Sequence, residues 1–411
     1  MQSDWFKRPD LGEQSWWDEL KKIGTPLIEQ SDKDDGTARV SFIWQDPEPD
    51  AKQSNTQRVW LNLTGVNDHH QCMYPQSLER IGQTDVWALE MNLNRTYRGS
   101  YVLMPSSQDS DYQGPADDML SVRTWWQSIF SHAQADPLNH HRSWTGGRGI
   151  PSSALHMPDA PDQSIWQSVD EGANITGDIQ LTQHHWNSAL LENSRRVWTL
   201  CFGQSTNQRP LAIILDGAFW IEQMPLPIPL SQLTKQSKLP SDAVYLFIDS
   251  VNSAQRAQEL PCNPTFWQAV QHELLPQIKE HTPYSQDPER TIIAGQSFGG
   301  LASAYATLKF PSIARNAICQ SSSFWWPKKQ KDNLDGTLLS ELEQHQFSRL
   351  RRRFFIESGN GELLIQKANQ HVIELLKAQG HALISRTVTG GHDAMCWRGG
   401  LTDGLCALWA N

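Results

Sequence analysis

The chain has 411 residues, which is too long for one typical core, so we expect two domains. It carries 35 Lys and Arg against 45 Asp and Glu, a net charge of -10, and the acidic excess is concentrated in residues 1–160. This balance argues against a nucleic-acid partner, which requires clustered basic residues. The N-terminus lacks the apolar run of a signal peptide, and no stretch approaches the roughly 18 apolar residues of a membrane span. We therefore expect a cytoplasmic protein without a membrane partner.

Cysteine and tryptophan content adds to this picture. The six cysteines contain no C-x-x-C pair and are few for the length, so we expect reduced thiols. The chain has 18 Trp against 7 Tyr. We expect most of the tryptophans to fill hydrophobic cores and a few to line a site for flat aromatic rings. The cysteines are Cys72, Cys201, Cys262, Cys319, Cys396 and Cys406.

The first part of the chain has the pattern of half-buried strands. Residues 1–37 are polar with short helical patches, and from Ala38 onward apolar side chains recur at every second position. This period predicts short antiparallel strands of a β-sandwich. A turn-rich segment over 136–162 follows, and we place the domain boundary near residue 160. The alternating positions are Val40, Phe42 and Trp44, then Val59, Leu61 and Leu63, with further runs at 86–93 and 101–104.

Beyond residue 160 the pattern changes to strand followed by helix. Short, unbroken apolar runs are typical of strands buried on both faces, and helical stretches such as 266–278 and 366–376 separate them. This alternation predicts an α/β domain over residues 161–411, with a mostly parallel sheet and helices on both faces. The runs are 211–215, 244–248, 291–294, 317–319 and 354–356.

One motif indicates nucleophilic catalysis. Residues 291–300 read T-I-I-A-G-Q-S-F-G-G and place G-x-S-x-G between a strand-like run and a helix-forming stretch, the setting of a nucleophile elbow. The glycines suit a strained turn in which neighbouring backbone passes close to the serine. Ser297 is therefore the candidate nucleophile, and a glycine-rich turn without chemistry is the alternative.

A serine nucleophile needs a base, and the base is usually oriented by an acid. His392 lies after the elbow on a glycine-flanked loop past the run 383–388, where a general base is expected. Glu357, at the end of a strand, is the preferred acid. Glu362 in the loop beyond it is an alternative, and a Ser-His pair without an acid is another.

An oxyanion needs two backbone N–H donors. Phe298 follows the nucleophile and supplies one of them. The second is expected after an early strand, in L-A-I-I-L-D-G-A-F-W, where Ala218 is the candidate donor and Gly217 the turn that exposes it. An ordinary Asp-Gly turn is the alternative reading of this segment.

Three histidine pairs precede the elbow, at 69–70, 140–141 and 184–185. Adjacent residues seldom bind one ion, and no regular ligand spacing follows them. We therefore expect no protein-bound metal.

These residues together resemble the enterochelin esterases, which hydrolyse the ferric enterobactin trilactone. The resemblance implies an immunoglobulin-like, early-set β-sandwich domain over residues 1–160 and an α/β-hydrolase catalytic domain of the esterase-D-like kind over 161–411. It runs nearly end to end and rests on the strings R-V-W-L-N-L-T-G-V-N-D-H-H (58–70), A-D-P-L-N (135–139), W-T-G-G-R-G (144–149), N-S-R-R-V-W (193–198), L-D-G-A-F-W (215–220), R-A-Q-E-L-P-C-N (256–263), G-Q-S-F-G-G (295–300) and G-G-H-D-A-M-C-W-R-G-G (390–400).

The resemblance implies a macrocyclic trilactone of dihydroxybenzoyl-serine, ferric or iron-free, as the substrate. Iron is then cargo of the substrate, and no cofactor is expected. A ferric tris-catecholate is trianionic and aromatic, so cationic and aromatic side chains suit it. Arg256 matches a family arginine near the scissile carbonyl, although an ion pair with Glu259 is the alternative. The full set of candidate substrate-binding residues is Arg256, Arg195, Arg196, Arg398, Trp220 and Trp397.

Two other functions fit the same residues. A general carboxylesterase or acyltransferase would have the same Ser-His machinery. A non-catalytic protein that binds ferric catecholate would hold Ser297 for structural reasons only. The sequence leaves the oligomeric state open.

Overall fold

A computed structural model describes residues 3–30, 35–71, 73–109, 111–146, 149–327, 336–347 and 350–410. Cys72 and residues 147–148 of the predicted Gly-Gly-Arg-Gly turn lie outside them. The chain divides into two compact units. The first unit comprises Met1–Asp162, Asp170–Gly172 and Thr389–Cys396, and the second comprises Gln163–Val169, Ala173–Val388 and Trp397–Asn411. Residues 389–396 thus belong to the first unit, which the sequence analysis did not foresee.

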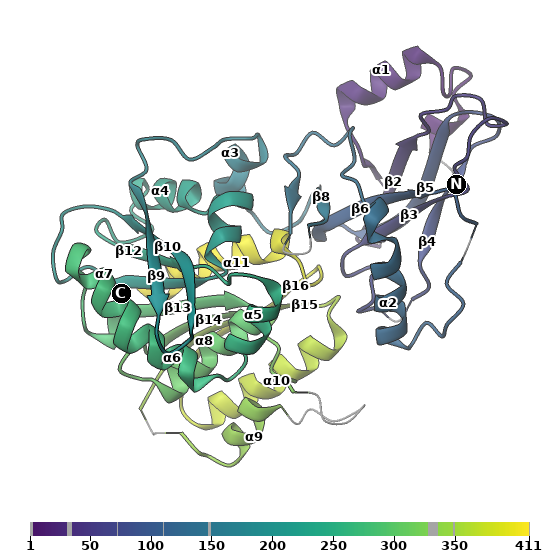
Figure 1. Ribbon diagram of the computed structural model, residues 1–411. Helices are drawn as coiled ribbons and strands as arrows, with labels where there is room; N and C mark the ends of the chain where they lie inside the picture. Colours follow the sequence, from purple (N-terminus) through teal and green to yellow (C-terminus); the bar gives the residue numbers. More distant parts are fainter. Residues whose placement is uncertain are drawn as a thin grey trace. The chain divides into compact units, whose positions relative to one another are not determined.

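The first unit is mostly β-structure (Figure 1). Its strands follow the order β1-β2-β5-β4-β3-β6-β8-β7, and the paired neighbours are antiparallel. The six alternating residues predicted on β2 and β3 share one buried core with Tyr101 and Leu103 of β6, so the predicted period of two is confirmed. The strands are β1 (Leu27–Gln30), β2 (Thr37–Gln45), β3 (Arg58–Leu63), β4 (Gln76–Arg80), β5 (Val86–Asn94), β6 (Arg98–Ser106), β7 (Trp144–Thr145) and β8 (Pro151–His156).

Two helices of this unit explain part of its tryptophan content. In α1 (Gln14–Ile23), Trp16 and Trp17 are buried in a small core of their own. The helix α2 (Met119–Ile129) was not predicted from the sequence. It begins after Asp118, whose carboxylate accepts hydrogen bonds from two backbone N–H groups of the first turn, as is usual for an N-cap. Its Trp125 packs edge-on against Trp60 of β3, with ring centroids 4.9 Å apart. These tryptophans therefore fill cores.

The second unit is a mixed α/β layer structure. The sheet order is β16-β15-β14-β13-β11-β12-β10-β9. Strands β11 to β16 are parallel, and β10 and β9 run antiparallel at one edge. The strands are β9 (Leu181–Ser188), β10 (Asn193–Cys201), β11 (Leu211–Leu215), β12 (Val244–Ile248), β13 (Thr291–Gln296), β14 (Asn316–Gln320), β15 (Arg353–Gly359) and β16 (Ala382–Val388).

The parallel strands confirm the predicted buried runs, but the β9-β10 hairpin was not predicted. Its sequence is polar, and two arginines interrupt the apolar pattern of β10. One of them, Arg195, is buried together with Glu259. A search for apolar runs misses this strand because a buried position holds a charged residue.

Helices cover both faces of this sheet. Side chains of α6, α8 and α10 share one large core with Ile213, Ile293 and Ile356. On the opposite face, α11 packs closely against β14. A Cβ added to Gly404 of this helix would lie only 3.0 Å from the Ile318 side chain. The helices are α3 (Gln167–Asp170), α4 (Pro227–Lys235), α5 (Ser253–Glu259), α6 (Pro264–Ala269), α7 (Leu275–His281), α8 (Phe298–Lys309), α9 (Thr337–Glu343), α10 (Leu363–Ala378) and α11 (Ala394–Trp409), with π-helical turns at Phe219–Gln223 and Val270–Leu274.

Two further expectations concern the cysteines and the membrane. The five cysteines within the described residues are free. No helix in this part of the chain has the length and apolar character needed to cross a membrane.

The stability of the second unit is expected to fall at acid pH because of His381, which lies between α10 and β16. Burial and the nearby Arg352 lower its pKa from 6.5 to about 4, and its Nδ1 is buried without a hydrogen-bond partner. His381 therefore binds a proton more readily in the unfolded chain than in the folded protein. The folded state is favoured above pH 6.5, and this advantage is lost as the pH falls toward 4. We expect the loss to be about 2 kcal/mol.

Urea unfolding of wild type and His381→Gln at pH 7 and pH 4.5 measures this effect. The substitution should flatten the acid dependence, and His272→Gln, at an exposed position of the same unit, is the control. An identical pH dependence in His381→Gln and wild type would contradict the assignment.

Candidate active site

Ser297 lies in the sharp turn between β13 and α8. Its φ is +58° and its ψ is -119°, a strained conformation for a residue with a side chain. The turn is held by hydrogen bonds from Ser297 N–H to the Gln320 carbonyl (2.9 Å) and from Ser323 N–H to the Ser297 carbonyl (3.1 Å). The Ser297 hydroxyl lies 3.3 Å from the Ser323 hydroxyl and remains partly exposed. This is the strand-turn-helix geometry predicted from the motif.

Glycines around Ser297 are required by close backbone packing. A Cβ on Gly295 would lie 2.5 Å from the carbonyl of Gly299, and one on Gly300 would lie 2.2 Å from the Ser322 hydroxyl. Neither position can hold a larger residue without moving the turn. The structure thus gives these two glycines the physical role that the motif suggested.

The second turn of the site follows β11. Asp216 has a φ of +57°, and a Cβ on Gly217 would lie 2.8 Å from the backbone of Phe247 and Ile248 on β12. Ala218 follows in helical conformation and is partly exposed. Because β11 and β13 are parallel neighbours, the turns that carry Ala218 and Phe298 lie at the same edge of the sheet. This arrangement is suited to two oxyanion donors.

Arg256 of α5 connects these two turns. Its guanidinium forms a bidentate pair with Asp216, with N···O distances of 2.7 and 2.8 Å, and donates to the Gln296 carbonyl at 3.1 Å. Burial raises the pKa of Asp216, but the Arg256 charge outweighs this effect and the net pKa is lowered. The alternative pairing of Arg256 with Glu259 is wrong, because Glu259 pairs with Arg195 at 2.6 Å.

Replacement of Arg256 is expected to slow the reaction by loosening both turns. Lysine cannot make two parallel hydrogen bonds to Asp216, so Arg256→Lys should lower kcat and kcat/KM together, by roughly 10²-fold if it resembles loss of an oxyanion donor. Steady-state kinetics measures this. Arg95→Lys, which alters an exposed bidentate pair with Asp159, is the control. An increase in KM with unchanged kcat would instead show that Arg256 only attracts the anionic substrate.

Glu357 is part of a buried ladder across four strands. Gln296, Gln320, Glu357 and Arg386 are register partners on β13, β14, β15 and β16. The amide of Gln296 donates to Gln320 (3.0 Å), Gln320 donates to Glu357 (2.7 Å), and Arg386 forms an ion pair with the other oxygen of Glu357. Burial raises the pKa of Glu357, and Arg386 offsets only part of this rise. Both oxygens of Glu357 are thus engaged within the sheet.

Glu362 lies in the loop that follows β15. It is completely buried, and its Oε1 accepts hydrogen bonds from the Ser321 hydroxyl (2.6 Å) and from Gly359 N–H (2.8 Å). The same loop is tied to the end of β16, because Asn360 N–H donates to the Val388 carbonyl at 2.9 Å. Glu362 is therefore held close to the strand end from which the His392 loop departs.

His392 lies four residues after β16, in the segment 389–396 that belongs to the first unit. Ser297 belongs to the second unit. Their pairing stays a prediction.

Three of the predicted substrate-binding residues, Trp220, Arg195 and Arg398, are buried, and their contact with the substrate stays a prediction. Trp220 is fully buried and donates its Nε1 to the Gln296 side chain at 3.2 Å. Arg195 is buried with Glu259, and Arg398 is buried with its Nε 2.7 Å from the Gln163 side chain. Each of these three side chains makes a hydrogen bond or an ion pair inside the protein.

Apart from Arg256, the remaining candidates, Arg196 and Trp397, are more accessible. Arg196 is 37% exposed and pairs with Glu222 and Asp249. Trp397 is partly buried, and its Nε1 donates to the Ser321 hydroxyl at 2.8 Å. Substrate contact by Arg196 and by Trp397 stays a prediction.

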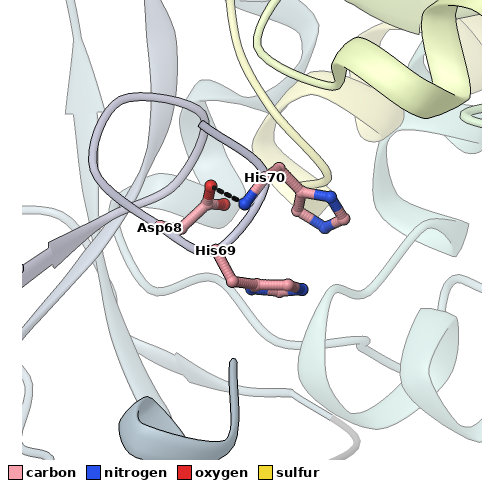
Figure 2. Close-up of side chains that lie close together, drawn as sticks. All are labelled: Asp68, His69 and His70. Carbon is pink, nitrogen blue, oxygen red and sulfur yellow. Dashed lines mark hydrogen bonds between the residues drawn. The ribbon is translucent and has the colours of Figure 1, made fainter. Parts of the chain in front are cut away.

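Two histidine-containing clusters of the described residues have ligand atoms within 4.8 Å of one another, Asp68-His69-His70 and His141-His156-Asp170. In the first, both Asp68 oxygens accept backbone N–H groups, as Figure 2 shows for His70. In the second, Arg98 donates to His156 Nδ1 at 2.8 Å, and its positive charge opposes a cation there.

The site and the sheet define a serine hydrolase of the α/β class. Residues 203–408 match the family model described as "Putative esterase", and residues 39–166 match the model "Enterochelin esterase, N-terminal". The iron(III) enterobactin esterase of Dickeya dadantii is 43% identical over 412 residues, covering 97% of this chain and 93% of that protein.

Solved structures agree with these matches. The ferric enterobactin esterase of Salmonella typhimurium is 42% identical, with a TM-score of 0.89 over 97% of this chain and 98% of that one. The enterobactin esterase of Shigella flexneri, determined in the presence of enterobactin, is 41% identical with a TM-score of 0.86 and the same coverage. The chain belongs to the iron(III) enterobactin esterase family.

Proposed function

We propose that this protein hydrolyses the ester bonds of the enterobactin trilactone, ferric or iron-free, to linear dihydroxybenzoyl-serine products. Cleavage of the scaffold weakens the iron complex and allows intracellular iron release. The observation that carries the proposal is the strained Ser297 at the end of β13, in a chain that resembles enterobactin esterases over 97% of its length.

The reaction follows from the chemistry of a serine nucleophile. The Ser297 hydroxyl attacks an ester carbonyl of the macrocycle while His392 accepts its proton. The backbone N–H groups of Phe298 and Ala218 stabilise the oxyanion. His392 then donates the proton to the departing serine oxygen of the substrate, and water releases the acyl group from Ser297 by the same steps. Iron takes no part in these steps, because it enters and leaves as cargo of the substrate.

We propose Glu362, rather than Glu357, as the acid that orients His392. Glu357 is committed to Arg386 and Gln320 inside the sheet. Glu362 lies in the loop bonded to the end of β16, four residues before the histidine. Its Oε1 is fixed by two donors, so the carboxylate is held in one orientation.

The finer fold and the cellular location belong to the same proposal. The antiparallel strands of the first unit, closed over one core, support an immunoglobulin-like sandwich. The free cysteines support a cytoplasmic address, because structural disulfides are rare there.

Chromatography of products after incubation with excess ferric enterobactin tests the proposal. Linear trimer, dimer and monomer should accumulate well beyond one equivalent of protein. A ferric-catecholate carrier would yield no product beyond one equivalent, and a general carboxylesterase would hydrolyse p-nitrophenyl butyrate in preference to enterobactin.

A further inference from the structure

The segment that carries His392 is fastened to the first unit along most of its length. Arg98 N–H, at the start of β6, donates to the Thr389 carbonyl at 3.0 Å. At the other end of the segment the Cys396 thiol lies 3.3 Å from the Arg98 carbonyl. His392 lies between these two attachments.

Glycines allow the middle of the segment to lie directly on the turn after β3. A Cβ on Gly391 would lie 2.5 Å from the backbone nitrogen of Gly65, and one on Gly65 would lie 2.6 Å from Gly391 Cα. Gly65 itself has a φ of +76°. The two backbones therefore touch immediately before His392, and neither can move toward the other.

Asp393 provides a polar attachment immediately after His392. It is 4% exposed. One carboxylate oxygen accepts from Met395 N–H in the first turn of α11 at 2.8 Å. The other accepts both the backbone N–H of Ser100 and its hydroxyl, the latter at 2.6 Å. One buried carboxylate thus joins the start of α11 to strand β6.

The same turn after β3 places an aromatic ring beside the predicted base. Asp68 fixes the turn by accepting from Gly65 N–H (3.1 Å) and His70 N–H (3.0 Å), and Figure 2 shows His69 and His70 projecting from it. The ring centroids of His70 and His392 are 5.5 Å apart, with planes at 41°. The imidazole of His392 therefore has a neighbour from the first unit as well as a fixed backbone.

We propose that the first unit positions the general base, with Asp393 and Ser100 as positioning residues that act through His392. The inference rests on the proposed role of His392. It gives the N-terminal domain a part in the chemistry, because a base displaced by about 1 Å can cost roughly 10²-fold in rate. Ser297 belongs to the other unit, and the attachment holds only the segment that carries His392, so we expect kcat to depend on it more than KM.

Kinetics of three variants on ferric enterobactin tests the proposal. We expect Asp393→Asn to lower kcat by about 10²-fold with KM within about twofold of wild type. Ser100→Ala should lower kcat by several-fold, and Ser100→Thr, which restores the hydroxyl, should recover most of it. In the double variant the effects should not multiply, because both residues serve one attachment. Ser106→Ala, at the other end of β6, is the control and should behave as wild type.

The role of His392 and its positioning by Asp393 and Ser100 can be contradicted separately. If His392→Ala retains turnover, the proposed function of that residue fails. If His392→Ala is inactive while Asp393→Asn and Ser100→Ala keep wild-type kcat, the positioning inference alone fails. A parallel fall of kcat in Ser100→Ala and Ser100→Thr, with a lowered melting temperature in both, would also overturn it, because that result indicates a packing defect.

Discussion

Ser297→Ala is expected to fold as wild type and to lose nearly all turnover of ferric enterobactin. The Ser297 side chain makes a hydrogen-bond contact with Ser323 at 3.3 Å, so its removal should cost little stability. Loss of a serine nucleophile in a comparable hydrolase lowers kcat by roughly 10⁶-fold. Product chromatography and the thermal unfolding midpoint measure the two quantities together.

Ser323→Ala is the matched comparison, because its hydroxyl lies 3.3 Å from that of Ser297. It should keep most of the activity, and mass spectrometry should find the acyl group or a fluorophosphonate adduct on Ser297 only. Retention of more than a few per cent of activity in Ser297→Ala would contradict the assignment of the nucleophile.

Local features of the site could be predicted from the sequence. The G-x-S-x-G motif defines a strained turn because its glycines permit close backbone contact, and Ser297 does have a φ of +58°. The strand runs were also predictable, because five consecutive buried residues in β11 or β12 leave an unbroken apolar pattern. Such features depend on residues close together in the chain.

Pairings between distant residues could not be predicted in the same way. Asp216 and Arg256 are 40 residues apart, and periodicity indicates which face a residue occupies but not which strand lies beside it. The ladder from Gln296 to Arg386 depends on the register of four strands. The prediction of Glu357 as the acid therefore depends on its place in one strand and takes no account of its neighbour on β16.

Buried charged residues are a second feature that could not be predicted from the sequence. Arg195 and Arg398 were interpreted as ligands for an anion, yet both are buried. The partner of Arg195, Glu259, lies 64 residues away, and only the fold shows that the charge is neutralised internally. Composition cannot distinguish such an arginine from one that faces an anionic substrate.

Glu362→Gln is expected to lower kcat strongly while preserving the fold. Glutamine keeps an oxygen that can accept from Ser321 and Gly359, so the loop should stay in place. Without the carboxylate charge, the proposed His392 imidazolium loses its stabilisation and its correct tautomer, which in serine proteases costs up to about 10⁴-fold. Steady-state kinetics on ferric enterobactin measures the loss.

Glu357→Gln is the control with the same chemical change. It removes a buried charge that pairs with Arg386, so it should lower the unfolding midpoint more than Glu362→Gln and affect kcat less. Near wild-type rates in Glu362→Gln together with a strong loss in Glu357→Gln would show that Glu357, on β15, is the acid. Wild-type rates in both variants would indicate a Ser-His pair that works without an acid, because neither carboxylate would then be needed to hold the imidazole.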